Sequence, residues 1–77
     1  MTWISDMTDR IAGATGIEVG ALTVDAAAAD TLLRLASVAA HESGERTNAP
    51  LLCHVIGRAV ALGTPLDELA RVVEGAS

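Results

Sequence analysis

The fold is decided by residues 24–63, which read VDAAAADTLLRLASVAAHESGERTNAPLLCHVIGRAVALG. Alanine and leucine recur in the first half at the three- and four-residue spacing of an α-helix. A polar segment follows at residues 41–48, and a second apolar segment begins with Asn48-Ala49-Pro50. We therefore predict two helices joined by a short polar break, over about residues 25–43 and 48–62. Few side chains in this stretch are polar, so most of them suit close packing better than chemistry.

The first of these helices has clear signals at both ends. Thr23 or Asp25 can accept the free amides of its first turn, and Gly44 suits a left-handed residue after its last turn. The apolar face expected in the core comprises Ala28, Leu32, Leu35, Ala36 and Ala39. Asp30 and Arg34 lie on the opposite, solvated side at the i,i+4 spacing of a favourable ion pair.

The second helix takes Asn48 as its cap and carries Pro50 in its first turn, where the missing amide costs nothing. Its expected core residues are Leu51, Leu52, Val55, Ile56, Ala59 and Leu62. A glycine in mid-helix costs roughly 1 kcal/mol relative to alanine. Gly57 is therefore best explained by a close approach of another helix, and it predicts a tight crossing with the helix over residues 25–43.

A further helix, over about residues 2–14, precedes this stretch and ends at Gly13 or Gly16. Its apolar stripe, which recurs at helical spacing, consists of Trp3, Ile4, Met7 and Ile11. The connector over residues 15–23 keeps three apolar side chains, Ile17, Val19 and Leu22. We expect this connector to fold back across the bundle as a packed loop.

A last helix is predicted over residues 64–75, with Thr64 as its cap, Pro65 at its first position and Gly75 at its end. Its apolar side comprises Leu66, Leu69, Ala70, Val72 and Val73. Short connections between the last three helices favour antiparallel neighbours, and no segment shows the alternation of a strand. We therefore predict a single all-α domain over residues 1–77, folded as a small four-helix up-and-down bundle.

The predicted core is thin, because Trp3 is the only aromatic residue among the 77. A domain of this size retains only about 3–5 kcal/mol after chain entropy is subtracted. Burying a further apolar face against a second copy is a natural supplement, so a homodimer is one expected state.

Charge and cysteine content limit the partners and the compartment. The formal charge is −5, with ten acidic residues, five arginines and no lysine. Nucleic acid binding requires a basic patch, so we expect no nucleic acid partner. The longest apolar segment, residues 49–63, is shorter than the roughly 20 residues of a membrane span, so no membrane partner is expected. The single Cys53 and the acidic N-terminal residues, which do not resemble a secretory signal, predict a cytoplasmic location.

No constellation of residues suits catalysis or metal binding. A metal site would need His41, Cys53, His54 and a carboxylate such as Glu42 or Glu45. The adjacent Cys53 and His54 point about 100° apart on a helix, and no C-x-x-C or H-x-x-x-H spacing is present. We therefore predict no enzyme activity, no metal and no cofactor, with Cys53 as a small buried hydrophobe.

The polar segment 41–48 has two interpretations. In one it is a capped turn, with His41 interacting with the helix dipole and Arg46 with free carbonyls. In the other it is a binding edge, where His41 and Arg46 hold an anionic group or a partner carboxylate. His54 lies on an outer face of its helix beside Arg58. The candidate ligand- or partner-binding residues are therefore His41, Arg46 and His54.

Several short motifs of the two central helices resemble a known family. They are Val24-Asp25, Leu32-Leu33-x-Leu35-Ala36, Ala40-His41, Arg46, Ala49-Pro50-Leu51 and Gly57. They are similar to an uncharacterised small helical domain family of high-GC Gram-positive bacteria, whose members occur alone or fused to molybdenum-cofactor guanylyltransferases. The chain departs from that pattern in the Glu42-Ser43-Gly44-Glu45 insertion. The resemblance implies an accessory role beside an enzyme and transfers no activity, because the family has none assigned.

These observations favour a non-catalytic protein-interaction or accessory module, with a protein partner or a second copy of the chain. By resemblance alone, the module is linked to molybdenum-cofactor metabolism. The alternative is a small-ligand or metal-binding helical protein that uses His41, Arg46 and His54.

Overall fold

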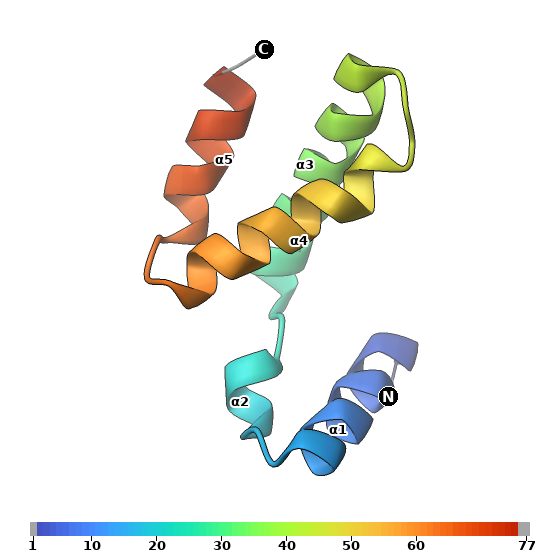
Figure 1. Ribbon diagram of the computed structural model, residues 1–77, viewed down its shortest axis with the longest axis vertical. Helices are drawn as coiled ribbons and strands as arrows, with labels where there is room; N and C mark the ends of the chain where they lie inside the picture. Colours follow the sequence, from blue (N-terminus) through green and yellow to red (C-terminus); the bar gives the residue numbers. More distant parts are fainter. Residues whose placement is uncertain (1, 76–77) are drawn as a thin grey trace.

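The computed structural model describes residues 2–75 and contains helices joined by short turns (Figure 1). The helices are α1 (Trp3–Thr15), α2 (Val19–Leu22), α3 (Ala26–Ser43), α4 (Asn48–Ala61) and α5 (Leu66–Gly75). No strand is present among residues 2–75. The prediction of an all-α chain is therefore confirmed. None of the described helices is both long and apolar enough to cross a membrane.

The ends of the helices follow local rules. The Asp25 carboxylate accepts the Ala28 amide at 2.8 Å and caps α3, as the sequence predicts. Gly16 and Gly44 end α1 and α3 in the left-handed region, with φ of 75° and 74°. The predicted cap of α4 is wrong by one residue, because Asn48 is already helical and Thr47 precedes it.

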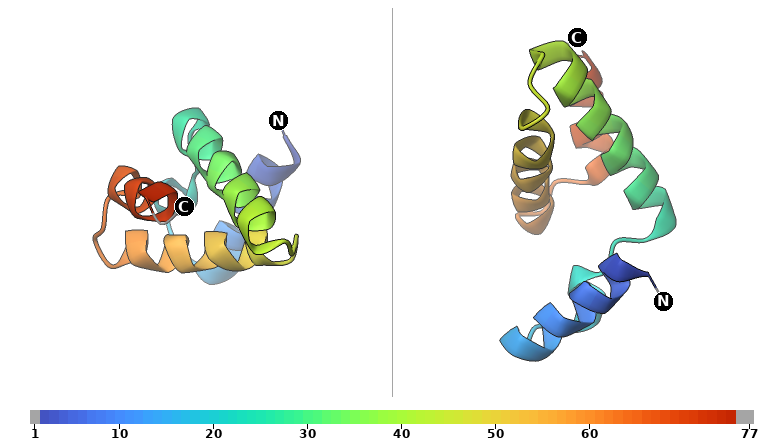
Figure 2. Two further views of the ribbon diagram at one scale, coloured as in Figure 1. Left: turned by 90° about the horizontal axis from the view of Figure 1, so that it is seen from above. Right: turned by 90° about the vertical axis from the view of Figure 1, so that its right-hand side faces the viewer.

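Helices α3, α4 and α5 form one packed unit. α3 and α5 run toward the same end of the molecule, and α4 runs back across both of them (Figures 1 and 2). The centre of this unit is formed by Leu35, Ile56 and Ala70, one buried residue from each helix. Partly buried side chains around them are Leu32, Leu52, Leu66, Leu69 and Val73. The core is small, as the composition predicts.

Helices α1 and α2 form a separate hairpin. They contact each other, and within residues 2–75 neither contacts α3, α4 or α5. Neither helix contains a buried residue. The hairpin lies at the end of the molecule opposite the C-terminus, joined to α3 by residues 23–25 (Figures 1 and 2). The four-helix up-and-down arrangement is thus not confirmed, because α1 lies apart from the three packed helices.

The connector over residues 15–23 does not fold across the bundle, and that prediction is wrong. Ile17 and Val19 are exposed. The segment instead forms α2, which turns back along α1 after the left-handed Gly16. Because α2 is a single helical turn, it satisfies the backbone locally without reaching α3.

Two predictions about α4 are also wrong. Leu51, Val55 and Leu62 were expected in the core but are exposed, Leu62 to 89%. A side chain added at Gly57 would meet no atom within 4 Å, so no helix crosses closely there. α3 and α5 cover only the side of α4 that carries Ile56 and Leu52. The apolar arc of α4 is wider than two neighbouring helices can cover.

Candidate functional site

The polar turn between α3 and α4 is held mainly by bonds within itself. His41 lies in the last turn of α3, where its Nδ1 is 2.8 Å from the Ser37 carbonyl oxygen and 3.2 Å from the Ser37 hydroxyl. With its proton on Nδ1, the ring donates to that carbonyl. The Ser43 hydroxyl donates to the Ala39 carbonyl at 2.6 Å and accepts the Glu45 amide at 3.2 Å. The His41 contacts match that part of the capped-turn interpretation, whereas the Arg46 side chain bonds no helix carbonyl among residues 2–75.

Arg46 and His54 lie open on the surface. The Arg46 guanidinium has no hydrogen bond or ion pair within the described part of the chain, while its carbonyl accepts the Ala49 amide at 3.1 Å. His54 is exposed on α4, as is Arg58 one turn later. No bond joins any two of the candidates His41, Arg46 and His54 in the part of the chain that the structure describes. Their role in binding stays a prediction.

Metal-ligating side chains do not converge in the described chain. Across residues 2–75, no group of three or more His, Cys, Asp or Glu side chains is placed to hold an ion. Cys53 is a free, half-buried thiol in α4.

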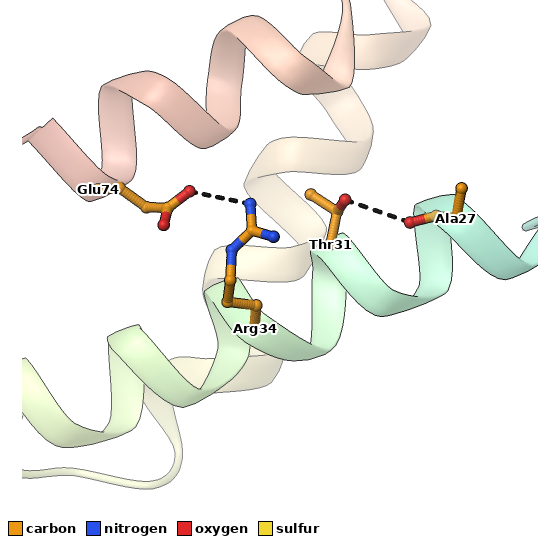
Figure 3. Close-up of polar contacts among 4 residues, drawn as sticks. All are labelled: Ala27, Thr31, Arg34 and Glu74. Atoms are coloured by element: carbon orange, nitrogen blue, oxygen red, sulfur yellow. Dashed lines mark hydrogen bonds and ion pairs between the residues drawn. The ribbon is translucent and has the colours of Figure 1, made fainter.

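An ion pair that the sequence did not indicate joins α3 to α5. The Arg34 Nη2 lies 2.9 Å from Glu74 Oε1, and both side chains are about half exposed (Figure 3). Arg34 therefore reaches across to a residue forty positions away, whereas the helical spacing pointed to Asp30. Exposed pairs of this kind contribute about 0–1 kcal/mol. The pair adds orientation to α5 more than stability, and no local sequence signal could have identified it.

An open apolar hollow of about 410 Å³ lies between α3, the start of α4 and α5. Its walls include Val38, Leu52, Val72 and Val73. Glu42 is the one ionisable side chain that lines it. Such a surface accepts an apolar side chain, and its polar lining is limited to Glu42, Ser43 and Asn48.

Exposed apolar side chains are the dominant surface feature. Those with large exposed areas are Trp3, Ile4, Ile11, Ile17, Val19, Val24, Leu33, Leu51, Val55, Val60, Leu62 and Val72. Two sets of them lie on single helix faces. The first, which we term the α1 stripe, consists of the exposed Trp3, Ile4 and Ile11 together with the half-buried Met7. The second, the α4 stripe, consists of Leu51, Val55 and Leu62, which lie within about 40° of one another at 100° per residue.

Comparison with protein-family models, curated proteins and solved structures finds no match for this chain. The resemblance to the small helical domain family therefore stays a prediction that rests on the motifs of α3 and α4. Among those motifs, Leu32 and Leu35 are required by the core. His41, Arg46 and Pro50 are exposed, so packing of this chain does not require them.

Proposed function

We propose that this chain is a non-catalytic protein-interaction module that binds its partner through the exposed apolar faces of its helices. The observation that carries the proposal is that far more large apolar side chains are exposed than buried. Twelve are exposed, whereas the buried core holds Leu35, Ile56 and the small Ala70. Scattered apolar residues are normal on a surface, but contiguous apolar faces mark interaction sites.

The large solvent-accessible surface of the molecule supports the proposal. The chain has 5669 Å² of accessible surface, whereas a compact monomer of its mass has about 4,400 Å². Its radius of gyration is 13.3 Å, against about 11.5 Å for a compact domain of this length. The excess area, about 1,300 Å², exceeds the roughly 800 Å² that each partner buries in a standard interface.

The solvent exposure of the polar side chains supports the non-catalytic role that we propose. His41, Arg46 and His54 are all exposed. Catalytic groups act most strongly in sites from which water is excluded. None of these three side chains has such a setting.

Three finer expectations belong to the same proposal. Four-helix packing would arise in the assembled state, where a partner covers the α1 and α4 stripes. A cytoplasmic location is supported by the single free Cys53. An accessory role beside a molybdenum-cofactor guanylyltransferase is supported only by the motifs in α3 and α4.

The test is a comparison of wild type with a variant whose α4 stripe is made polar, Leu51→Ser with Val55→Ser. Both positions are exposed, so the fold should survive, which circular dichroism can check. We expect wild type to self-associate in analytical ultracentrifugation or to retain a specific protein from a native lysate. We expect the variant to lose that property. A wild type that stays monomeric at high concentration and retains no more protein than the variant would refute the proposal.

The alternative, a small-ligand or metal-binding protein, draws on the exposed Arg46 guanidinium, which has no ion pair within residues 2–75. Titration with zinc or inorganic phosphate, followed through the imidazole NMR signals, tests it. We expect no saturable shift of the His41 or His54 signals. A saturable shift that Arg46→Ala removes would favour the alternative instead.

A further inference from the structure

We infer that the partner is a second copy of this chain, and that the α1 stripe of each copy packs on the α4 stripe of the other. This inference rests on the proposed function and specifies the partner. It follows from which faces lack cover, from the separation of the hairpin from α4, from charge and from area.

The α1 stripe lacks a partner in its own chain. Trp3 is 73% exposed, and Ile4 and Ile11 are also exposed. α2 is the one described helix that contacts α1. Within the stripe only Met7 is half-buried, and the half-buried Thr8 and Ala12 lie on a different side of α1, about 100° from its centre. α2 therefore leaves most of the stripe open.

The α4 stripe is open in the same way. Val55 is 61% exposed, and Leu51 and Leu62 are more exposed still. Residues 51–62 span about 16 Å of helix, and the α1 stripe over residues 3–11 spans about 12 Å, at 1.5 Å per residue. The two stripes therefore have similar lengths and can lie along one another as neighbouring helices do.

The hairpin does not contact α4 of its own chain within residues 2–75. The Thr23 amide and hydroxyl both donate to the Val19 carbonyl, at 3.0 Å and 2.8 Å, and close the end of α2. Asp25 caps the start of α3. Val24 is the one residue between these two fixed ends. Because the hairpin does not cover α4 in this arrangement, the α4 stripe is accessible to a second copy.

Charge favours contact between unlike stripes. Residues 2–25 carry four carboxylates and one guanidinium, on Asp6, Asp9, Glu18, Asp25 and Arg10. α4 carries Arg58 and no carboxylate. A pairing of α1 with α1 would bring acidic hairpins together, whereas a pairing of α1 with α4 brings an acidic hairpin to a basic helix.

Symmetry and area complete the inference. In a dimer with twofold symmetry the same contact is made twice, so both stripes of both copies are covered. The excess accessible surface of about 1,300 Å² per chain corresponds to about 2,600 Å² for the pair, within the range of obligate homodimers. A dimer built on these stripes would therefore bury the surface area by which this chain exceeds a compact monomer of the same size.

A complementation experiment tests this arrangement. Ile4→Asp breaks the α1 stripe and Val55→Arg breaks the α4 stripe, each at an exposed position. We expect wild type to have twice the mass of one 7.8 kDa chain in sedimentation equilibrium, and each variant alone to have the mass of one chain. In an equimolar mixture one contact is wild type, and in the other the new carboxylate faces the new guanidinium. We expect the mixture to recover the dimer mass.

Ala61→Arg is the matched control, since it adds the same charge to α4 at an exposed position about 120° from Val55. It should remain dimeric. Variants that dimerise alone, or a mixture that stays monomeric, would overturn the inference. If wild type is monomeric but retains another protein through the α4 stripe, the inference fails and the proposed function stands. If it is monomeric and retains nothing, both fail.

Discussion

The two parts of this molecule use the same kind of helix and reach opposite results. α3, α4 and α5 each bury one residue at a shared centre, whereas α1 and α2 bury none. Both parts nevertheless show apolar residues at helical spacing. The difference teaches that periodicity identifies the side of a helix that needs cover, and that it does not identify what covers it.

The difference also bears on stability. An isolated helix shorter than about 12–15 residues is marginal in water, and α1 has 13 residues with a single-turn partner. The hairpin therefore depends on cover from outside, while α3–α5 contain their own core. Local opening should be easier in α1 than in α3.

The largest effect should come from the core of α3–α5. Leu35 is fully buried, so Leu35→Ala should lower the free energy of unfolding by about 2–5 kcal/mol. Leu33, in the same helix, is 70% exposed, and Leu33→Ala should change it by less than about 0.5 kcal/mol. Urea denaturation followed by circular dichroism measures both. Equal losses in the two variants would contradict the division into a covered and an uncovered side of α3.

A smaller loss is expected where the two parts join. Asp25→Ala removes the side chain that accepts the Ala28 amide at 2.8 Å and should destabilise by about 1 kcal/mol. Asp25→Ser keeps an acceptor and should retain most of the stability. Hydrogen exchange should show the loss at the first turn of α3. A variant with unchanged exchange there would show that the cap does not hold this junction.

Gly57→Ala should raise stability by about 0.5–1 kcal/mol. The position is inside a helix, and an added side chain meets nothing within 4 Å. Gly44→Ala is the contrast, because φ there is 74°, and it should destabilise. Thermal unfolding of both variants at low concentration is the measurement. A destabilised Gly57→Ala would mean that another backbone does approach α4 at this point.

The smallest effect concerns the ion pair between α3 and α5. A double-mutant cycle with Arg34→Ala and Glu74→Gln should give a coupling below about 1 kcal/mol that falls as salt is raised. A parallel cycle with Asp30→Ala should give a smaller coupling to Arg34. A larger coupling to Asp30 would support the helical spacing over the pair seen in the structure.

The accuracy of the sequence-based predictions depends on the range of the interactions involved. Gly44 was identified from the sequence, and Gly16 and Asp25 were each one of two candidates, because caps depend on residues within one turn. Leu35 and Ile56 belong to the predicted apolar faces, although each lies at an edge of its face at 100° per residue. Val55 lies near the middle of the predicted α4 face and is exposed, since burial depends on where neighbouring helices pack.

The candidate site shows the same limit. The exposure of His54 could be expected from its position beside Arg58 on an outer helix face. The bond from His41 to Ser37 is also local, spanning one helical turn. The pairing of Arg34 with Glu74 could not be expected, because it joins residues forty positions apart.

The sequence by itself determined the helical class, the glycine end of α3 and the apolar sides of the longer helices, because these depend on backbone chemistry and spacing within a few residues. Tertiary structure decided that α1 and α2 stand apart from α3–α5, that Arg34 pairs with Glu74, and that Leu51, Val55 and Leu62 face outward. Those outcomes depend on which surfaces meet, and three packed helices can cover only part of the apolar surface that the sequence provides.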